Sequence, residues 1–210
     1  TFLIVGCLGG LFTLSSCTAP TNVKDYSAYV NPFIGTGGHG HTFPGAVVPH
    51  GMIQPSPDTR IDGWDACSGY YYADSTINGF SHTHVSGTGC CDYGDVLLMP
   101  TVGKQQYRTT DPQSQRLAYA SSFSHKNEIA EPGYYSVFLD TYQVKAEISS
   151  TKRGAIHRYT FPENTESGFI IDLDYSLQRQ TNSEMEIEVI SDTEICGHKK
   201  TTYWAFDQYI

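Results

Sequence analysis

Short stretches of alternating hydrophobic and polar residues recur through the second half of the chain, at intervals of roughly a dozen residues. They predict strands over 117–123, 133–139, 142–149, 155–161, 169–173, 181–190 and 200–209. The second and third strands form a predicted hairpin through Asp140 and Thr141. No stretch keeps a helical period of 3.6 residues. The pattern therefore predicts an all-β protein, specifically a β-sandwich.

The first half shows shorter extended runs separated by loops rich in glycine and proline. Extended pieces are predicted over 29–34, 46–54, 80–85 and 95–100, with a turn at Asn78-Gly79. Within 80–85, a strand would place Phe80, His82 and His84 on one face. The intervening sequence GTGGHGHTFPG, residues 35–45, contains five glycines and a proline, which predicts a loop.

The first residues, TFLIVGCLGGLFTLSS, form a hydrophobic run of the length found in secretory signals. The run ends in Leu14-Ser15-Ser16-Cys17, which resembles a bacterial lipobox. We therefore expect a lipoprotein signal peptide over 1–16, a diacylated Cys17 with a tether over 17–28, and one domain over 29–210. An ordinary secretory signal or a frayed first strand remains the alternative. The missing initiator Met and a strand-like run that reaches Ile210 predict that the chain is a fragment truncated at both ends.

Acidic residues outnumber basic ones by 22 to 13, which gives a formal net charge of −9 and no electrostatic case for binding nucleic acid or anionic lipid. A neutral ligand fits this balance better. Export would place the cysteines after the tether in an oxidising compartment, where their pairing stays open among three connectivities. These cysteines are Cys67, Cys90, Cys91 and Cys196, and they include no CxxC motif that would predict a thiolate zinc site.

Residues with candidate chemistry are concentrated between positions 29 and 100, which hold five of the eight histidines and most of the glycines. His39 and His41 flank Gly40, and His82 and His84 have strand-like spacing, so two H-x-H edges meeting in space would suit a metal. The alternative is that these imidazoles form hydrogen bonds to the backbone or to sugar hydroxyls. No metal ligand is assigned, because no Asp or Cys stands at a spacing that completes a known site.

Carboxylates and tryptophans supply the remaining candidates. A glycosidase needs two facing carboxyl groups, and the loops of this region carry five aspartates, although aspartate in a loop more often caps a turn. Trp64 is interpreted either as a platform that stacks on a sugar ring or as a core residue, and Trp204 is predicted to lie in the core. The five aspartates are Asp58, Asp62, Asp65, Asp92 and Asp95.

Three motifs carry a resemblance to a known family: VNPFIGTGGHGHTFPGAVVPHGMIQPSPDT, GWDACSGYYY and INGFSHTHVSGTGCCDYGDVLLMPT. They resemble the N-terminal domain of glycoside hydrolase family 92, the exo-acting, calcium-dependent α-mannosidases of gut Bacteroidetes. The resemblance implies an N-terminal β-sandwich followed by an (α/α)6 domain, with the active site between the two. It also implies hydrolysis of terminal α-mannosidic bonds of glycans such as N-glycans, often α-1,2 bonds, with inversion.

In the family the catalytic acid, the catalytic base and most calcium ligands belong to the C-terminal domain, so this chain alone is expected to be inactive and to contain no catalytic residue. The resemblance implies that the N-terminal domain supplies part of the sugar pocket. Two positions depart from the family pattern, Ala66 and Cys91, and the first bears on linkage preference. The implied pocket residues are Gly37, Gly38, His39, Trp64 and Cys67, with His82 and His84 as secondary candidates.

Expected partners are mannose-containing glycans, the protein's own C-terminal domain and, through a lipid anchor only, a membrane. The expected location is the periplasm or the outer-membrane surface of a Bacteroidetes-like bacterium. Two alternatives belong to other classes. One is a non-catalytic carbohydrate-binding lipoprotein, and the other is a metal-binding β-sandwich that holds zinc through its histidine pairs.

Overall fold

The structure is a computed structural model that describes residues 24–105, 107, 114–163, 165–204 and 207–210. The expected signal peptide, Cys17 and most of the tether lie outside the described residues. Over the part of the chain that is described, no helix is long and hydrophobic enough to cross a membrane.

Twelve strands and three short 3-10 helices make up the described regular structure, so the prediction of an all-β fold is confirmed. The 3-10 helices are η1 (Ser27–Tyr29), η2 (Trp64–Ala66) and η3 (Leu177–Arg179). The strands are β1 (Ser56–Asp58), β2 (Thr76–Ile77), β3 (Gly79–Ser81), β4 (Leu97–Val102), β5 (Ser121–Glu131), β6 (Tyr134–Leu139), β7 (Val144–Ser150), β8 (Ala155–Thr160), β9 (Ser167–Asp172), β10 (Thr181–Ser191), β11 (Glu194–Thr202) and β12 (Gln208–Tyr209).

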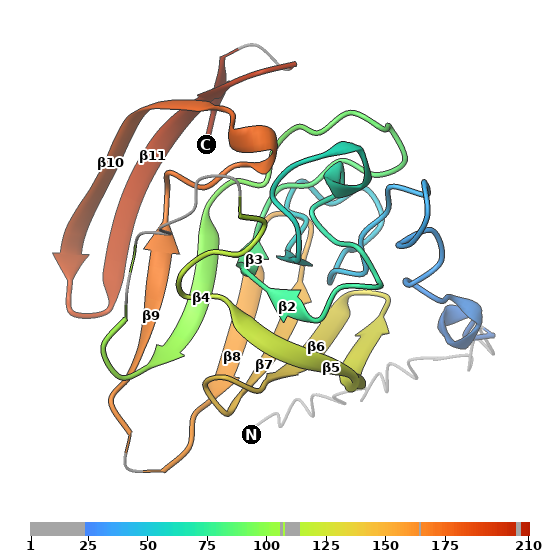
Figure 1. The fold of residues 1–210 in the computed structure, drawn as a ribbon, viewed down its shortest axis with the longest axis horizontal. Helices are drawn as coiled ribbons and strands as arrows, with labels where there is room; N and C mark the ends of the chain where they lie inside the picture. The colour runs from blue at the N-terminus through green and yellow to red at the C-terminus, as the bar shows by residue number, and fades with distance from the viewer. Residues whose placement is uncertain (1–23, 106, 108–113, 164, 205–206) are drawn as a thin grey trace, which may run out of the picture.

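These strands form antiparallel sheets in the orders β1-β3-β4-β9, β2-β5-β6-β7-β8 and β10-β11-β12 (Figure 1). The first two pack face to face as a sandwich, because alternate residues of each strand contribute to one shared core. Phe80, Leu97 and Met99 come from one sheet, and Tyr135 and Val137 come from the other. In Figure 1 the long ribbon of β10 and β11 extends beside β9, away from the sandwich.

The predicted hairpin is confirmed by the pairing of β6 with β7, in which Leu139 faces Val144. The predicted turn at Asn78-Gly79 is wrong. Asn78 instead separates β2 from β3, and these strands belong to different sheets. Gly79 begins β3 with an ideal Cβ position only 2.7 Å from Leu97 Cγ, so its missing side chain allows close packing.

Three other predictions of extended structure need correction. Residues 29–34 form the end of a 3-10 helix and turns, and residues 46–54 form no strand. The strand over 80–85 stops at Ser81, so the face shared by Phe80, His82 and His84 does not form. Trp204, predicted to be core, is 65% exposed, because it follows the end of β11 rather than lying within a covered strand.

Candidate functional site

Three loops meet at the upper end of the sandwich in the view of Figure 1. The amide of Gly87 donates a 2.6 Å hydrogen bond to the carbonyl oxygen of His41. A Cβ atom on Gly89 would lie 2.7 Å from the Trp64 ring, so this glycine lets the indole settle against the backbone. We call the result the three-loop surface, made of residues 35–42, 63–67 and 86–91.

The glycines of the first loop have distinct roles. A Cβ on Gly40 would lie 2.1 Å from the carbonyl oxygen of Gly35, so the loop closes only with glycine at this position. Gly38 has a φ of +57° and nothing within 4 Å of an added Cβ, which leaves its backbone open to a ligand. Gly37 and Gly38 are both exposed. The loop therefore presents accessible backbone groups, as a sugar-binding surface requires.

Two histidines and one carboxylate meet on this surface. His39 Nδ1 lies 2.7 Å from Asp65 Oδ1, and His41 Nε2 lies 3.9 Å from the same oxygen. The Trp64 indole is 60% exposed and packs edge-on against the His41 ring at a centroid distance of 4.8 Å. Trp64 is therefore held at its edge while much of its surface stays accessible, which is the arrangement that a stacking platform needs.

Cys67 lies beneath this surface rather than on it. Its Sγ donates a 2.7 Å hydrogen bond to the carbonyl oxygen of Trp64, which braces the turn that carries the indole. The side-chain amide of Gln178 supports the same turn from below, donating to the carbonyl oxygen of Gly63 and to Cys91 Sγ. Burial raises the pKa of both thiols. Buried and protonated, Cys67 would act by positioning Trp64 and not by touching a sugar.

His84, a secondary candidate, is completely enclosed. Its Nδ1 donates to the carbonyl oxygen of Gln54 at 2.7 Å, and its Nε2 lies 2.8 Å from Asp58 Oδ1 and 3.0 Å from Ser81 Oγ. The His84 and Asp58 side chains are both 0% exposed. The His84 imidazole connects the loop after β3 to strand β1. Because it is fully buried, it cannot contact a ligand directly.

His82, the other secondary candidate, belongs to a hydrogen-bonded chain that joins the two sheets. Its Nδ1 is 2.7 Å from the carbonyl oxygen of Val96, and its Nε2 is 3.0 Å from His157 Nε2. The hydroxyl of Tyr159 lies 2.9 Å from His157 Nδ1. All three hydrogen bonds are satisfied when both imidazoles are neutral, with Tyr159 as the first donor and Val96 as the last acceptor.

Burial lowers the pKa of His82, and burial together with repulsion between the two protonated rings lowers the pKa of His157 to about 3. Below about pH 6.5 the unfolded chain therefore binds more protons than the folded one, so stability falls as the pH falls, by up to about 1.4 kcal/mol per pH unit for each histidine. We expect the urea midpoint to drop between pH 7 and pH 5. His157→Gln, which cannot be protonated there, should flatten that slope, and an unchanged slope would contradict this assignment.

The five aspartates do not form a facing acid and base pair. Asp58 and Asp95 are buried against His84 and Lys199. Asp62 and Asp92 accept hydrogen bonds from the amides of the residues that follow them, as turn-capping aspartates do. Asp65 is the member of this group that reaches the three-loop surface, where it contacts His39.

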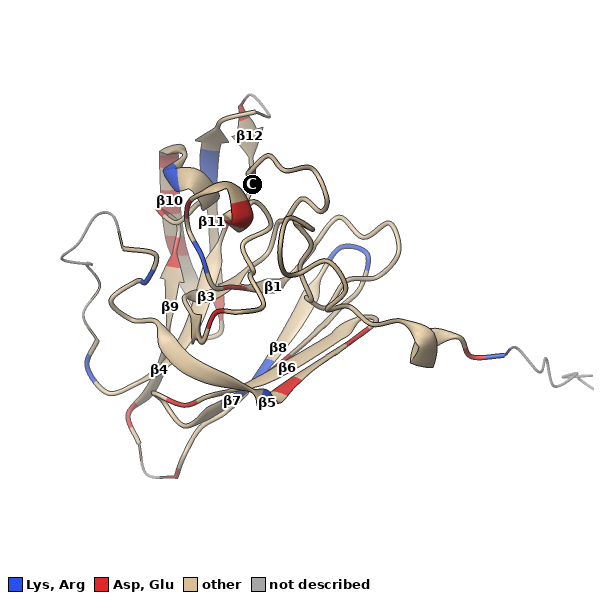
Figure 2. Ribbon diagram, turned by 45° about the vertical axis from the view of Figure 1, so that its right-hand side comes forward, with Lys and Arg blue, Asp and Glu red and all other residues tan. Residues whose placement is uncertain are grey.

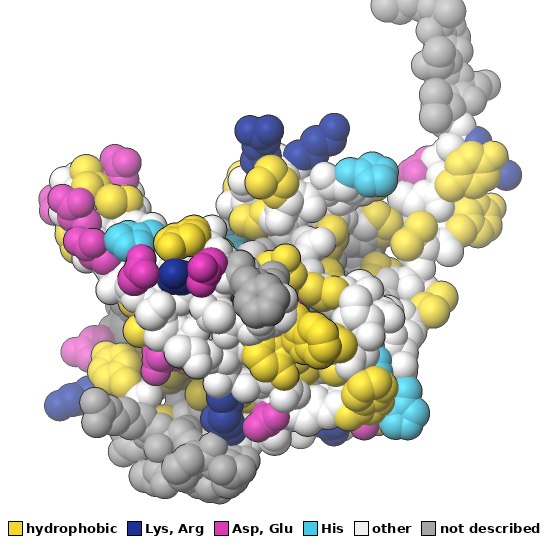
Figure 3. Space-filling model, turned by 90° about the horizontal axis from the view of Figure 1, so that it is seen from above, with side chains coloured by type: hydrophobic (Ala, Val, Ile, Leu, Met, Phe, Trp, Pro, Cys, Tyr) yellow, Lys and Arg dark blue, Asp and Glu magenta, His cyan; other side chains and the backbone are white. Residues whose placement is uncertain are grey.

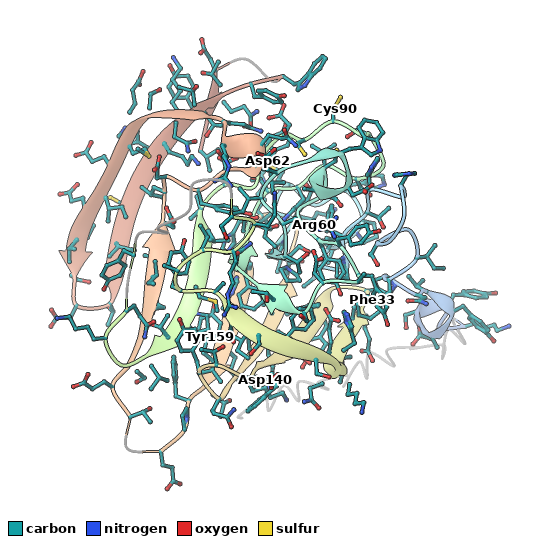
Figure 4. All side chains as sticks on the ribbon, in the orientation of Figure 1. Phe33, Arg60, Asp62, Cys90, Asp140 and Tyr159 are labelled. Atoms are coloured by element: carbon teal, nitrogen blue, oxygen red, sulfur yellow. The ribbon has the colours of Figure 1, made fainter. Side chains whose placement is uncertain are left out.

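The sequence pattern did not identify the partnership of Asp65 with both histidines, or the packing of Gly89 beneath Trp64. Glycine density in SGTGC was the available signal, but nothing in the sequence specifies that residues 86–91 return to residues 35–42. In Figure 4 Cys90, from the returning loop, and Asp62 lie at the upper end of the molecule, and Asp140 lies at the opposite end. Figure 3, which faces the upper end, shows several exposed hydrophobic side chains among uncharged neighbours.

The fold and the surface together define a β-sandwich domain that presents an indole, an exposed imidazole and open backbone at one end. Comparison with known proteins specifies the class further. Residues 29–210 match the family described as "Glycosyl hydrolase family 92 N-terminal domain". The chain belongs to this family.

Solved structures support the same relationship. The chain is similar to a family 92 α-mannosidase from Bacteroides thetaiotaomicron, with 40% identity, a TM-score of 0.82 and coverage of 87% of this chain and 24% of that one; that structure was solved with mannoimidazole and without it. It is also similar to a family 92 inverting mannosidase from the same species, with 30% identity, a TM-score of 0.65 and coverage of 86% and 24%.

A curated protein of Arthroderma benhamiae, described as an uncharacterized secreted glycosidase, is 32% identical over 143 residues. The match covers 67% of this chain and 18% of that protein. The chain thus spans less than a quarter of this relative and about a quarter of the two solved mannosidases.

Proposed function

We propose that this chain is the sugar-binding N-terminal domain of an exported α-mannosidase that removes terminal mannose, with inversion and with preference for α-1,2 bonds. The observation that carries the proposal is the three-loop surface, which combines the exposed indole of Trp64, the exposed His39 held by Asp65, and open glycine backbone. Family membership supports the reaction class, and the printed descriptions of an α-mannosidase and an inverting mannosidase support the substrate and the stereochemistry.

Each part of the surface would contribute one kind of contact. The indole of Trp64 offers an apolar face for the ring of a sugar, and the exposed imidazole of His39, oriented by Asp65, can exchange a hydrogen bond with a hydroxyl. Gly37 and Gly38 allow a sugar to approach the backbone. Inversion needs one carboxylic acid and one carboxylate across the scissile bond, and these would come from the C-terminal domain.

Calcium is part of the proposal for the whole protein, but the described residues do not fit it. Calcium takes six to eight oxygen ligands, whereas the metal-suited cluster of this domain has two imidazoles and one carboxylate. Calcium ligands would therefore lie in the C-terminal domain. The leader with Cys17 and the secreted fungal relative support export, and the lipid anchor and the bacterial surface location remain part of the proposal.

The test is hydrolysis of α-1,2-mannobiose by the full-length protein that contains this domain, with calcium and then with a chelator. Release of mannose that depends on calcium supports the proposal. Failure to cleave any α-mannoside with calcium present, together with retained binding of mannose-containing glycans, would favour the non-catalytic carbohydrate-binding lipoprotein. Comparison of α-1,2-, α-1,3- and α-1,6-linked disaccharides would decide the linkage.

Trp64→Ala is expected to raise KM about 2- to 13-fold, because loss of an aromatic platform costs roughly 0.5–1.5 kcal/mol. Trp204→Ala is the matched control, since Trp204 is also exposed but lies outside the three-loop surface. It should leave KM unchanged. Equal effects of the two substitutions on KM would remove Trp64 from the sugar-binding surface.

A further inference from the structure

One cluster on the three-loop surface has the composition of a metal site. The Nδ1 of His39, the Nε2 of His41 and the Oδ1 of Asp65 all lie within 4.8 Å of one another. They come from two loops, and the Gly87 hydrogen bond to His41 together with the short η2 helix that contains Asp65 holds them together. Contact with a glycan would account for the exposed imidazole of His39, but not for the buried imidazole of His41 beside it.

His41 is the second observation. The residue is 8% exposed, its Nε2 is buried, and that nitrogen has no hydrogen-bond partner. A buried polar atom left without a partner costs roughly 1–3 kcal/mol, and such atoms are uncommon in native proteins. The nitrogen is 3.9 Å from Asp65 Oδ1, too far for a hydrogen bond but close enough for both atoms to bind one ion. A metal would satisfy this nitrogen.

We propose that His39, His41 and Asp65 bind a divalent transition-metal ion of the zinc class. Two neutral imidazoles and one carboxylate suit Zn²⁺, whose bonds to such ligands are about 2.0–2.2 Å long. In a tetrahedral site these bonds set neighbouring ligand atoms about 3.3 Å apart, so the present separations need only small adjustments. The His39 side chain is 75% exposed and free to make them.

Three protein ligands leave a fourth position for water or for a hydroxyl of a ligand. The ion would stand beside Trp64, since the indole packs against the His41 ring. The site is distinct in donor chemistry from the calcium expected in the C-terminal domain. It goes beyond the proposed function, because binding of a metal here does not depend on mannoside hydrolysis.

The test is titration of the tag-free, chelator-treated chain with ZnCl₂ in a calorimeter, at pH 7.5 with excess calcium present. We expect one saturable zinc per chain with a Kd in the micromolar range or lower. His41→Ala and Asp65→Asn should each weaken binding by at least about 100-fold, because even substitutions beyond the ligands commonly cost 10- to 100-fold. Binding should also weaken as the pH is lowered, because zinc binds deprotonated ligands.

Controls separate this site from other zinc donors. His198→Ala is the matched control, because His198 also lies near a carboxylate, 4.0 Å from Glu186, but belongs to β11 and has no second histidine in its ion pair. It should leave the affinity unchanged. Cys90 and Cys196 are exposed thiols, so a Cys90→Ser/Cys196→Ser chain should keep the site.

Co²⁺ in place of Zn²⁺ supplies a readout of coordination geometry, since four-coordinate Co²⁺ absorbs strongly in the visible range. These bands should appear with the parent chain and disappear with Asp65→Asn. The Asp65 side chain is partly exposed, and asparagine has the same shape, so this substitution should leave the fold intact. Absence of saturable zinc binding would overturn the proposal. Zinc binding that survives both His41→Ala and Asp65→Asn but is lost in the cysteine variant would also overturn it.

Discussion

Lys199→Met is expected to lower the free energy of unfolding by about 3–5 kcal/mol, because it leaves a buried carboxylate without its cation. Lys199 Nζ lies 2.8 Å from Asp95 Oδ1, and both side chains are 0% exposed. The same ammonium group donates to the carbonyl oxygen of Tyr175 at 2.8 Å. Loss of the lysine thus removes two contacts between β11 and the sandwich.

The surroundings of Asp95 explain why its charge cannot simply move into water. The hydroxyl of Thr201 donates to one carboxylate oxygen at 2.9 Å, and that of Thr83 donates to the other at 3.0 Å. Thr201 lies on β11 and Asp95 lies two residues before β4, so this network anchors the projecting β10–β11 ribbon. Figure 2 shows acidic positions along β10, the strand that pairs with β11.

Urea unfolding of the chain measures this effect, and Lys200→Met is the matched control. Lys200 is the next residue of β11, but its ion pairs with Asp207 and Glu184 are at the surface, so its loss should cost no more than about 1 kcal/mol. Combining Asp95→Asn with Lys199→Met should recover at least about 2 kcal/mol relative to the sum of the two single losses. Equal losses for Lys199→Met and Lys200→Met would mean that Asp95 is compensated by other groups.

The second large effect is expected at Gly69, where alanine should lower the free energy of unfolding by about 2–5 kcal/mol. Gly69 has a φ of +78°, which favours glycine, and an added Cβ would lie 2.0 Å from Asp58 Oδ1. That oxygen contacts His84 Nε2, so the methyl group would separate a buried pair. Backbone strain contributes roughly 1–2 kcal/mol, and overpacking roughly 1–3 kcal/mol.

Gly103→Ala separates the two contributions. Gly103 has a φ of +73°, close to that of Gly69, but nothing lies within 4 Å of an added Cβ. Its substitution should therefore cost only the backbone term, roughly 1–2 kcal/mol. If both variants lose the same stability in urea unfolding, the contact with Asp58 is relieved by a small shift and contributes nothing.

The sequence by itself determined the class of fold and the family. Alternation over 133–149 specified the β6–β7 hairpin, because a period of two residues places one face of each strand in the core. The glycine-rich motifs indicated where the chain forms loops and carried the resemblance to family 92. Local pattern sufficed in both cases, since hairpin pairing and loop chemistry depend on residues close together in the chain.

Only the tertiary structure decided which candidates share a surface. His82 and His84 look equivalent to His39 and His41 in sequence, yet hydrogen bonds tie the first pair into the sandwich, whereas the second pair lies beside Asp65 at its end. Asp65 joins the second pair across an intervening stretch of chain, and Lys199 finds Asp95 across nearly half of it. Such long-range contacts depend on how the sheets pack, so the local periodicity of the sequence does not predict them.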